Sequence, residues 1–150
     1  MADGLILDCL KVFQIYSVYT REEDCKTFIE SLDPDNPDVC DLGIFLKETG
    51  EAIGMGGFTY HPEEDAWEVG YNLRRDMWGQ GIVPEAMKAI LEYIKGLREV
   101  KAITGTFAAE NKKSGRVMEK LGMAYWCECE FTKLDGSETF KAIRYRKDFV

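Results

Sequence analysis

Two glycines flank a single polar residue in the stretch MWGQGIVPEAM (77–87), and they form the first candidate site of this sequence. Pro84 suits the first turn of a helix, so we expect a loop that turns into a helix here. The N–H groups at the start of a helix have no intrahelical partners, and the helix dipole makes that end positive. Gly79 and Gly81 remove the side chains that would hold a ligand away from this backbone. The pattern favours a bound anion, phosphate above all; the alternative is a tight turn that needs glycine only for its angles.

The common nucleotide-binding loops do not match this stretch. A P-loop requires the spacing G-x-x-x-x-G-K-[ST], which fails at Gln80 and Ile82. A dinucleotide fingerprint needs a third glycine where Pro84 stands, and an acidic residue about 20 positions further on. Neither of these two nucleotide-binding folds therefore fits the loop, and both the phosphate site and the tight turn remain open for it.

The composition of the chain favours some classes of binding partner and disfavours others. The net charge of −8 disfavours nucleic acid and would attract a cationic substrate such as an amine. No apolar run approaches the ~18 residues of a membrane span, and the start lacks the positive charge of a signal peptide, so we expect a cytoplasmic protein with no membrane contact. Five cysteines are scattered along the chain, and Cys127 and Cys129 have no second Cys/His pair at ligand spacing. We therefore expect no metal, and apolar packing of these two thiols.

The chain has no internal repeat and no linker, so we expect one domain, 1–150. Hydrophobic periodicity then predicts its elements. We expect helices at 20–32, 84–97 and 114–121, the last closed by a left-handed Gly122, and strands at 42–47, 52–60, 66–73, 101–107, 125–133 and 138–147. Antiparallel strands followed by strand, loop, helix and strand predict an α+β or mixed α/β fold with helices covering a sheet.

A second motif, ENKKSGRVMEKLGM (110–123), follows the strand predicted at 101–107. The strand GYNL, the loop WGQGIVPEA and the pattern N-x-x-S-x-x-V-x-x-K-L-G-M together resemble the GNAT superfamily of N-acetyltransferases, and more narrowly its RimJ/RimL-type branch. The resemblance runs from about residue 41 to the C-terminus, and more loosely through 20–32. It implies a mixed, mostly antiparallel sheet in which two central parallel strands splay into a V, with helices on both faces.

The resemblance also implies acetyl-CoA as co-substrate, lying in the V between 67–73 and 102–106 with its pyrophosphate on the backbone of 78–83. The pantetheine arm would pair with backbone at the end of the first strand and with an asparagine of the second motif. Asp76 stands where the common superfamily loop has Gln or Arg. Sequences of the RimJ/RimL-type branch often lack that residue, so the departure is interpreted as a feature of the branch, with weaker phosphate binding as its expected cost. The residues implied to hold the cofactor are Leu73, Arg74, Trp78, Gly79, Gln80, Gly81, Ile82, Val83, Asn111 and Ser114.

Catalysis of acetyl transfer benefits from a general acid at the CoA thiolate. Many superfamily members use a tyrosine one turn before the glycine of the second motif, but Met118 occupies that place and cannot donate. Ser114 resembles the serine proposed for this role in the RimJ/RimL-type branch. Its alternative role is the N-cap of the helix.

For the general base, Glu68 lies where related enzymes often carry a catalytic glutamate. Strand alternation puts its side chain on the face opposite Tyr71. The alternative is an exposed strand glutamate with no catalytic role. His61 is expected to be a surface turn residue, whereas Tyr71 and Tyr125 are expected to pack as core aromatics rather than line an acceptor pocket.

The match fails at the N-terminus, where no good copy of the family's first strand is found. That strand is expected to be shortened, absent or supplied by a partner subunit, and a bare sheet edge would favour a homodimer. The leading prediction is an N-acetyltransferase that passes an acetyl group from acetyl-CoA to a primary amine, of a protein N-terminus or a small molecule, by direct attack. The alternatives are a catalytically degenerate acyl-CoA-binding sensor or interaction module, and a domain with no CoA site.

Overall fold

The computed structural model describes residues 35–132 and 136–149. Its elements are β1 (Val39–Phe45), β2 (Ala52–His61), β3 (Ala66–Leu73), a 3₁₀ turn (Arg75–Met77), α3 (Ile82–Leu97), β4 (Ala102–Ala108), α4 (Lys112–Lys120), β5 (Ala124–Thr132) and β6 (Thr139–Asp148). Every helix and strand predicted within this part is present, with ends that differ by at most three residues. The helix predicted at 20–32 and the question of the first strand lie outside the described residues.

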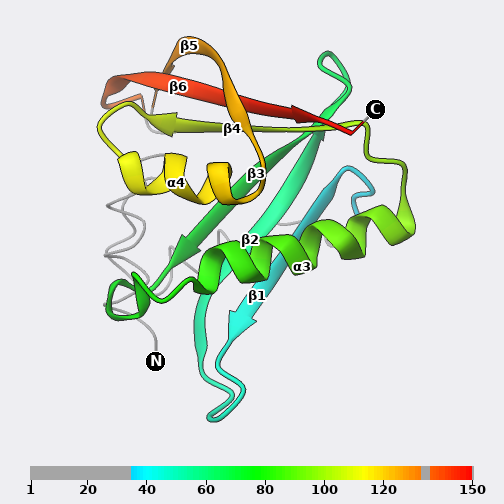
Figure 1. The fold of residues 1–150 in the computed structure, drawn as a ribbon, viewed down its shortest axis with the longest axis vertical. Coiled ribbons are helices and arrows are strands. Elements are labelled where there is room, and N and C mark those ends of the chain that lie inside the picture. Colours follow the sequence, from blue (N-terminus) through cyan, green and yellow to red (C-terminus); the bar gives the residue numbers. More distant parts are fainter. Residues whose placement is uncertain (1–34, 133–135, 150) are drawn as a thin grey trace.

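The described strands form one six-stranded sheet in the order β1-β2-β3-β4-β6-β5. All neighbouring pairs are antiparallel except β3 and β4, which run parallel. These two strands pair only at Trp67↔Ile103 and Glu68↔Thr104. Beyond Glu68 they diverge, so that the sheet opens into a V (Figure 1). The predicted splay is confirmed, and Glu68 marks its vertex.

Both described helices pack on the same face of the sheet (Figure 1). The amphipathic helix α3 lies against β1, β2 and β3, α4 lies against β4, and the two helices contact each other. The apolar stripe of α3 enters the core with Val83, Met87, Ile90, Leu91 and Ile94. This stripe is the one that the helical spacing in the sequence predicts. The expected helix cover on the other face concerns 20–32, outside the described residues.

Strand alternation in β3 is unbroken. Trp67, Val69 and Leu73 are buried toward the helices, whereas the Glu68 side chain between them points to the opposite face. No register shift interrupts the pairing of β2 with β3, so the phase expected from the sequence is confirmed. The consequence is that one strand supplies side chains to both faces of the sheet at the V. None of the described helices is long and apolar enough to cross a membrane.

Candidate functional site

The loop between β3 and α3 presents bare backbone. Gly79 and Gly81 adopt left-handed φ angles of 77° and 73°, and Gly81 is the N-cap of α3. A Cβ atom built on either glycine would meet nothing within 4 Å. The N–H groups of Gly79, Gln80 and Gly81 have no hydrogen-bond partner in the part of the chain that the structure describes, whereas that of Trp78 donates to Arg75 O at 3.2 Å. The loop thus provides free donors at the positive end of a 16-residue helix.

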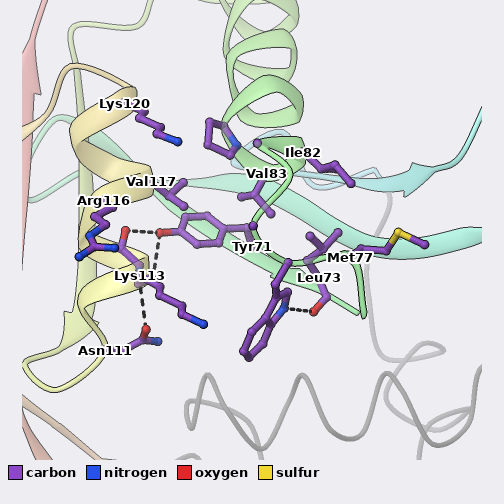
Figure 2. Close-up of a pocket in the computed structure, with 15 residues that line it drawn as sticks. Tyr71, Leu73, Met77, Ile82, Val83, Asn111, Lys113, Arg116, Val117 and Lys120 are labelled. Carbon is purple, nitrogen blue, oxygen red and sulfur yellow. Dashed lines mark hydrogen bonds between the residues drawn. The ribbon is translucent and has the colours of Figure 1, made fainter. Parts of the chain in front are cut away.

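A cavity of about 290 Å³ lies between this loop, the end of β3 and α4 (Figure 2). The predicted cofactor-binding residues that line it are Leu73, Trp78, Gly79, Gly81, Ile82, Val83, Asn111 and Ser114. Gln80 and Arg74 do not line it. The fold therefore brings the two sequence motifs together at one cavity, in the opening of the V.

Arg74 has other partners for each of its polar groups. Its backbone N–H donates to Ile53 O at 2.7 Å, and its carbonyl accepts from Met77 N at 2.9 Å. Its guanidinium pairs with Glu51 and Asp76, and this contact holds the pKa of Asp76 below its usual value. The acidic residue that departs from the family pattern is thus neutralised locally. The carbonyl of Leu73 accepts a hydrogen bond from Trp78 Nε1 at 2.8 Å, which ties the indole to the end of β3.

Three cationic side chains of α4 line the same cavity and were not singled out from the sequence. Lys113, Arg116 and Lys120 are spaced by three and four residues, so they share one helix face. Lys113 Nζ lies 4.8 Å from the centre of the Trp78 ring, and both residues line the cavity. The signal was present in KKSGRVMEK as a spacing of basic residues. Together with the loop N–H groups, these charges make the cavity suited to phosphate.

Asn111, rather than Ser114, is the N-cap of α4. The Asn111 side-chain oxygen accepts from Ser114 N at 3.4 Å, so Ser114 lies in the first helical turn and the N-cap alternative for it is wrong. The Ser114 side chain is buried and faces the cavity. The prediction that Gly122 closes this helix is confirmed by its φ of 83°. Met118 is 1% exposed and packs into the core, consistent with the expectation that it donates nothing.

Tyr71 reaches from β3 to α4, and this contact was not foreseen. Its hydroxyl donates to Ser114 O at 2.8 Å and lies 2.9 Å from Ser114 Oγ (Figure 2). Burial raises the pKa of Tyr71 to about 12. The ring also lines the cavity, so its description as a purely structural core aromatic is incomplete. Tyr125 is 62% exposed, so the expectation that it packs in the core is wrong.

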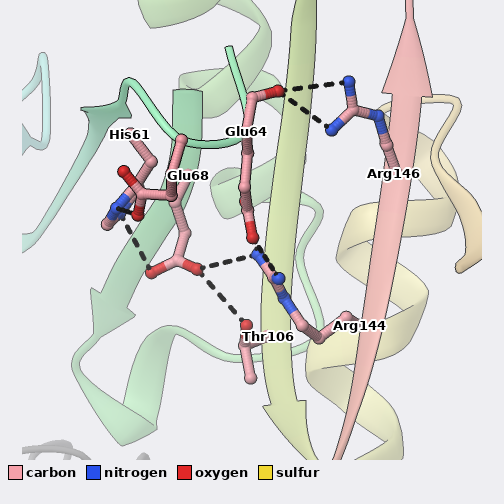
Figure 3. A network of polar contacts seen from close by, with 7 residues as sticks. His61, Glu64, Glu68, Thr106, Arg144 and Arg146 are labelled. Carbon is pink, nitrogen blue, oxygen red and sulfur yellow. Dashed lines mark hydrogen bonds and ion pairs between the residues drawn. The ribbon is translucent and has the colours of Figure 1, made fainter. Parts of the chain in front are cut away.

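Glu68 lies on the other face of the sheet within a polar network (Figure 3). Its carboxylate accepts from Thr106 Oγ1 at 3.3 Å and lies 3.6 Å from the Arg144 guanidinium. His61 is the last residue of β2 rather than a turn residue, and its Nε2 lies 3.8 Å from Glu68. The Glu68 side chain is 36% exposed, so the carboxylate is both held in place and open to a substrate.

Arg144 is fixed by a second carboxylate. Both of its terminal nitrogens bond Glu64, which lies in the turn before β3, and its guanidinium stacks 4.7 Å from the centre of the Trp126 ring. The hydrogen bonds from Arg144 hold the pKa of Glu64 below its usual value. A planar guanidinium held along one edge by a carboxylate and on its face by an aromatic ring has little freedom, so it offers Glu68 a stationary positive charge. No group of His, Cys, Asp or Glu among the described residues is arranged to hold a metal ion.

The Glu64–Arg144 pair should make the free energy of unfolding depend on acid pH. Because the pKa of Glu64 is lower in the folded chain than in the unfolded chain, its contribution is complete above about pH 4.3 and is lost as the pH falls through the lowered value. Denaturant unfolding at about pH 7 and about pH 3 should therefore show a smaller loss for Glu64→Gln than for the wild type. Equal losses in the two proteins would contradict this assignment.

Comparisons with known proteins identify the family and the fold. The family model for the acetyltransferase (GNAT) domain matches residues 9–124. An uncharacterized N-acetyltransferase, YnaD, from Bacillus subtilis is 34% identical over 104 residues, which cover 68% of this chain and 59% of YnaD. The [ribosomal protein uS5]-alanine N-acetyltransferase of Escherichia coli is 27% identical over 83 residues, 54% of this chain and 43% of that protein. The chain spans about half the length of the curated relatives it matches.

Solved structures share the fold. The microcin C7 self-immunity acetyltransferase MccE, in complex with acetyl-CoA and AMP, superposes with a TM-score of 0.77 at 18% identity, over 99% of this chain and 87% of that chain. A GNAT-family acetyltransferase from Bacillus anthracis gives a TM-score of 0.75 at 23% identity, over 98% of this chain and 84% of that chain.

Proposed function

Because this chain belongs to the GNAT family of acetyltransferases, we propose that it transfers an acetyl group from acetyl-CoA to a primary amine by direct attack. The observation that carries the proposal is the cavity at the opening of the V, which joins the bare glycine loop to the cationic face of α4. Acetyl-CoA supplies an activated thioester together with phosphates that can anchor it. The cavity offers donors and positive charge at one end, and two hydroxyl groups farther in.

The chain's own residues suit the co-substrate in three ways. The loop N–H groups at 79–81 would bind pyrophosphate at the start of α3, where glycine leaves the approach open. β3 pairs with β4 only at Trp67 and Glu68 before the two strands diverge, and the extended pantetheine arm would lie along β3 in the V. Asn111 lines the same cavity, and its amide NH₂ has no partner among the described residues.

We assign Glu68 as the group that removes the proton from the amine. Its position at the vertex, with the side chain on the face opposite the cavity, would let an acceptor approach the thioester from that side. Thr106 and Arg144 fix the orientation of the carboxylate. Ser114, inside the cavity, would serve the sulfur of the leaving group.

The acceptor is proposed to be a protein N-terminus or a small-molecule amine, as in the RimJ/RimL-type branch that the motifs resemble. The net charge of −8 favours a cationic acceptor of either kind. We also propose that the protein forms a homodimer. Light scattering that gives only the mass of a monomer would contradict the homodimer and leave the proposed activity untouched.

A catalytically silent acyl-CoA-binding sensor is the second candidate. It is favoured by the burial of Met118 at the position where many family members place a donor tyrosine. The two functions separate in a panel of amines that includes spermidine, free amino acids and peptides with N-terminal alanine or serine, with thiol release as readout. Release of CoA thiol with any amine supports the enzyme. Acetyl-CoA binding by thermal shift with no release across the panel supports the sensor, and no binding overturns both.

Charge removal on α4 should weaken CoA binding. The double variant Lys113→Gln/Arg116→Gln is expected to raise the Kd of CoA about tenfold at low salt, because two exposed cations near a phosphate each contribute modestly. The difference should shrink in high salt, since exposed charges are screened. Titration calorimetry measures it, with Lys112→Gln as the control, because Lys112 is exposed on α4 but does not line the cavity. An equal effect in the Lys112 variant would contradict a specific phosphate contact.

A further inference from the structure

We propose that Tyr71 and Ser114 act as one unit of two hydroxyl groups, in which Ser114 Oγ–H donates to the CoA thiolate and Tyr71 orients Ser114 by donating to its Oγ. The inference rests on the proposed function, because it needs CoA in the cavity. Tyr71 acts through Ser114, so it is a positioning residue for the leaving group. It supplies from β3 the phenol that the position of Met118 on α4 lacks.

The hydrogen-bond geometry gives this pair two arrangements. Ser114 presents two oxygens to the single phenol proton at nearly equal distance, its carbonyl O at 2.8 Å and its Oγ at 2.9 Å. When the proton points to Ser114 O, the Ser114 hydroxyl can donate back to the phenol oxygen, and both protons are used within the pair. When it points to Oγ, the Ser114 proton is released for a ligand. The change requires rotation of two O–H bonds and no movement of heavier atoms.

The surroundings favour the second arrangement once a negative charge arrives. Ser114 O is a carbonyl of α4, so it keeps a helical N–H partner when the phenol turns away. Tyr71 and Ser114 both line the cavity, and Ser114 is only 6% exposed, so little water competes for the hydroxyl protons. Hydrogen bonds that run in one direction strengthen one another in such a site. A thiolate that accepts the hydrogen bond from Ser114 is therefore stabilised by both hydroxyl groups.

The balance of protons and electrons in acetyl transfer shows which step the Tyr71–Ser114 pair can assist. Attack by the amine forms the C–N bond and breaks the C–S bond, whose electron pair remains on sulfur. The proton lost by nitrogen passes to Glu68 and from there to solvent. The pKa of Tyr71 is raised to about 12, whereas a thiol has a pKa of about 8.5, so transfer of a hydroxyl proton to sulfur is uphill. The pair donates hydrogen bonds and keeps its protons, and the thiolate takes a proton from solvent as the product leaves.

The test measures the pKa of the CoA thiol bound to the enzyme. Thiolate absorbance in the ultraviolet is followed against pH, and the spectrum of the desulfo-CoA complex is subtracted at each pH to remove protein tyrosines. The bound thiol of the wild type should titrate below free CoA. Ser114→Ala is expected to raise its pKa by about one unit, and Tyr71→Phe by a smaller amount, because one charge-assisted hydrogen bond is lost or weakened. Tyr71→Phe should also lower kcat by up to about tenfold.

A double variant and a matched control make the result decisive. In the Ser114→Ala background, Tyr71→Phe should produce no further shift, because Tyr71 acts through Ser114. Tyr145→Phe is the control: Tyr145 also donates from a strand to α4, to Glu119 at 3.2 Å, but does not line the cavity. Thermal shift with CoA confirms that each variant binds. If the wild type binds CoA and the bound thiol has the same pKa as in the variants, this inference alone is overturned. If the wild type binds no CoA, the proposed function is overturned. An equal effect of Tyr71→Phe with and without Ser114 overturns the coupling.

Discussion

Replacing Glu68 with glutamine is expected to lower kcat for acetyl transfer by about 10²–10⁴ while the Kd of CoA stays within about twofold. Glutamine keeps the size of the side chain and can still accept from Thr106, but it cannot take a proton from the amine. Because Glu68 lies on the face opposite the cavity, the donor site should be unaffected. Single-turnover thiol release and calorimetric CoA binding measure the two quantities separately.

The pH dependence provides an independent check of this role. A neutral amine needs no base to attack, so the deficit of Glu68→Gln should shrink as the pH rises toward the pKa of the acceptor, about 7.8 for an α-amine and about 10.4 for a lysine-like amine. Glu130→Gln is the control, because Glu130 is an exposed carboxylate on β5. Unchanged turnover in Glu68→Gln, or a deficit that is the same at every pH, would remove Glu68 as the base.

Gly81→Trp is expected to raise the Kd of CoA by more than about 100-fold, the second large effect. A side chain at this position meets no protein atom within 4 Å, and Gly81 lines the cavity, so the indole would project into space that the pyrophosphate needs. A loss of this size corresponds to about 2.7 kcal/mol, comparable to the removal of charge-assisted hydrogen bonds from two loop donors. Calorimetry with CoA measures it directly.

Backbone strain is a competing explanation, and Gly50 controls for it. Gly50 has a φ of 72° against 73° for Gly81, and a Cβ there also meets nothing within 4 Å. It lies in the turn between β1 and β2 and does not line the cavity. Gly50→Trp should therefore suffer a similar strain, with a similar fall in Tm, and bind CoA normally. Equal binding by both variants would show that the loop does not hold the co-substrate.

Local patterns predicted most of the described elements. The alternation in AWEVGYNL matches β3 from end to end, because a strand with one face in the core records its phase in the sequence. The apolar stripe of α3 and the left-handed Gly122 were equally readable. The predicted helix ends differ from the observed ones by a few residues, because capping residues decide where a helix begins and ends. Asn111 is the N-cap of α4, which makes Ser114 part of its first turn.

The candidate site was predicted in outline, through two motifs that carry a recognisable spacing. The resemblance identified the glycine loop, Asn111 and Ser114, and the fold places all of them at one cavity. It did not identify the three cations of α4 that line the cavity, because a basic residue on a helix is usually solvated and nothing local says which face meets another element. Arg74 illustrates the opposite error: it was predicted to hold the cofactor, but in the structure its guanidinium pairs with Glu51 and Asp76.

The sequence by itself determined the order of strands and helices, their buried faces, the open backbone of the glycine loop and the family to which these motifs are similar. The elements, their buried faces and the glycine loop depend on residues close together in the chain, and the resemblance depends on two such local motifs and the spacing between them. Only the tertiary structure decided that Tyr71 meets Ser114, 43 residues away, and that Arg144 bonds Glu64, 80 residues away. The physical reason is that a polar side chain takes whichever partner the packed sheet and helices bring within hydrogen-bond distance, and no local period encodes that choice.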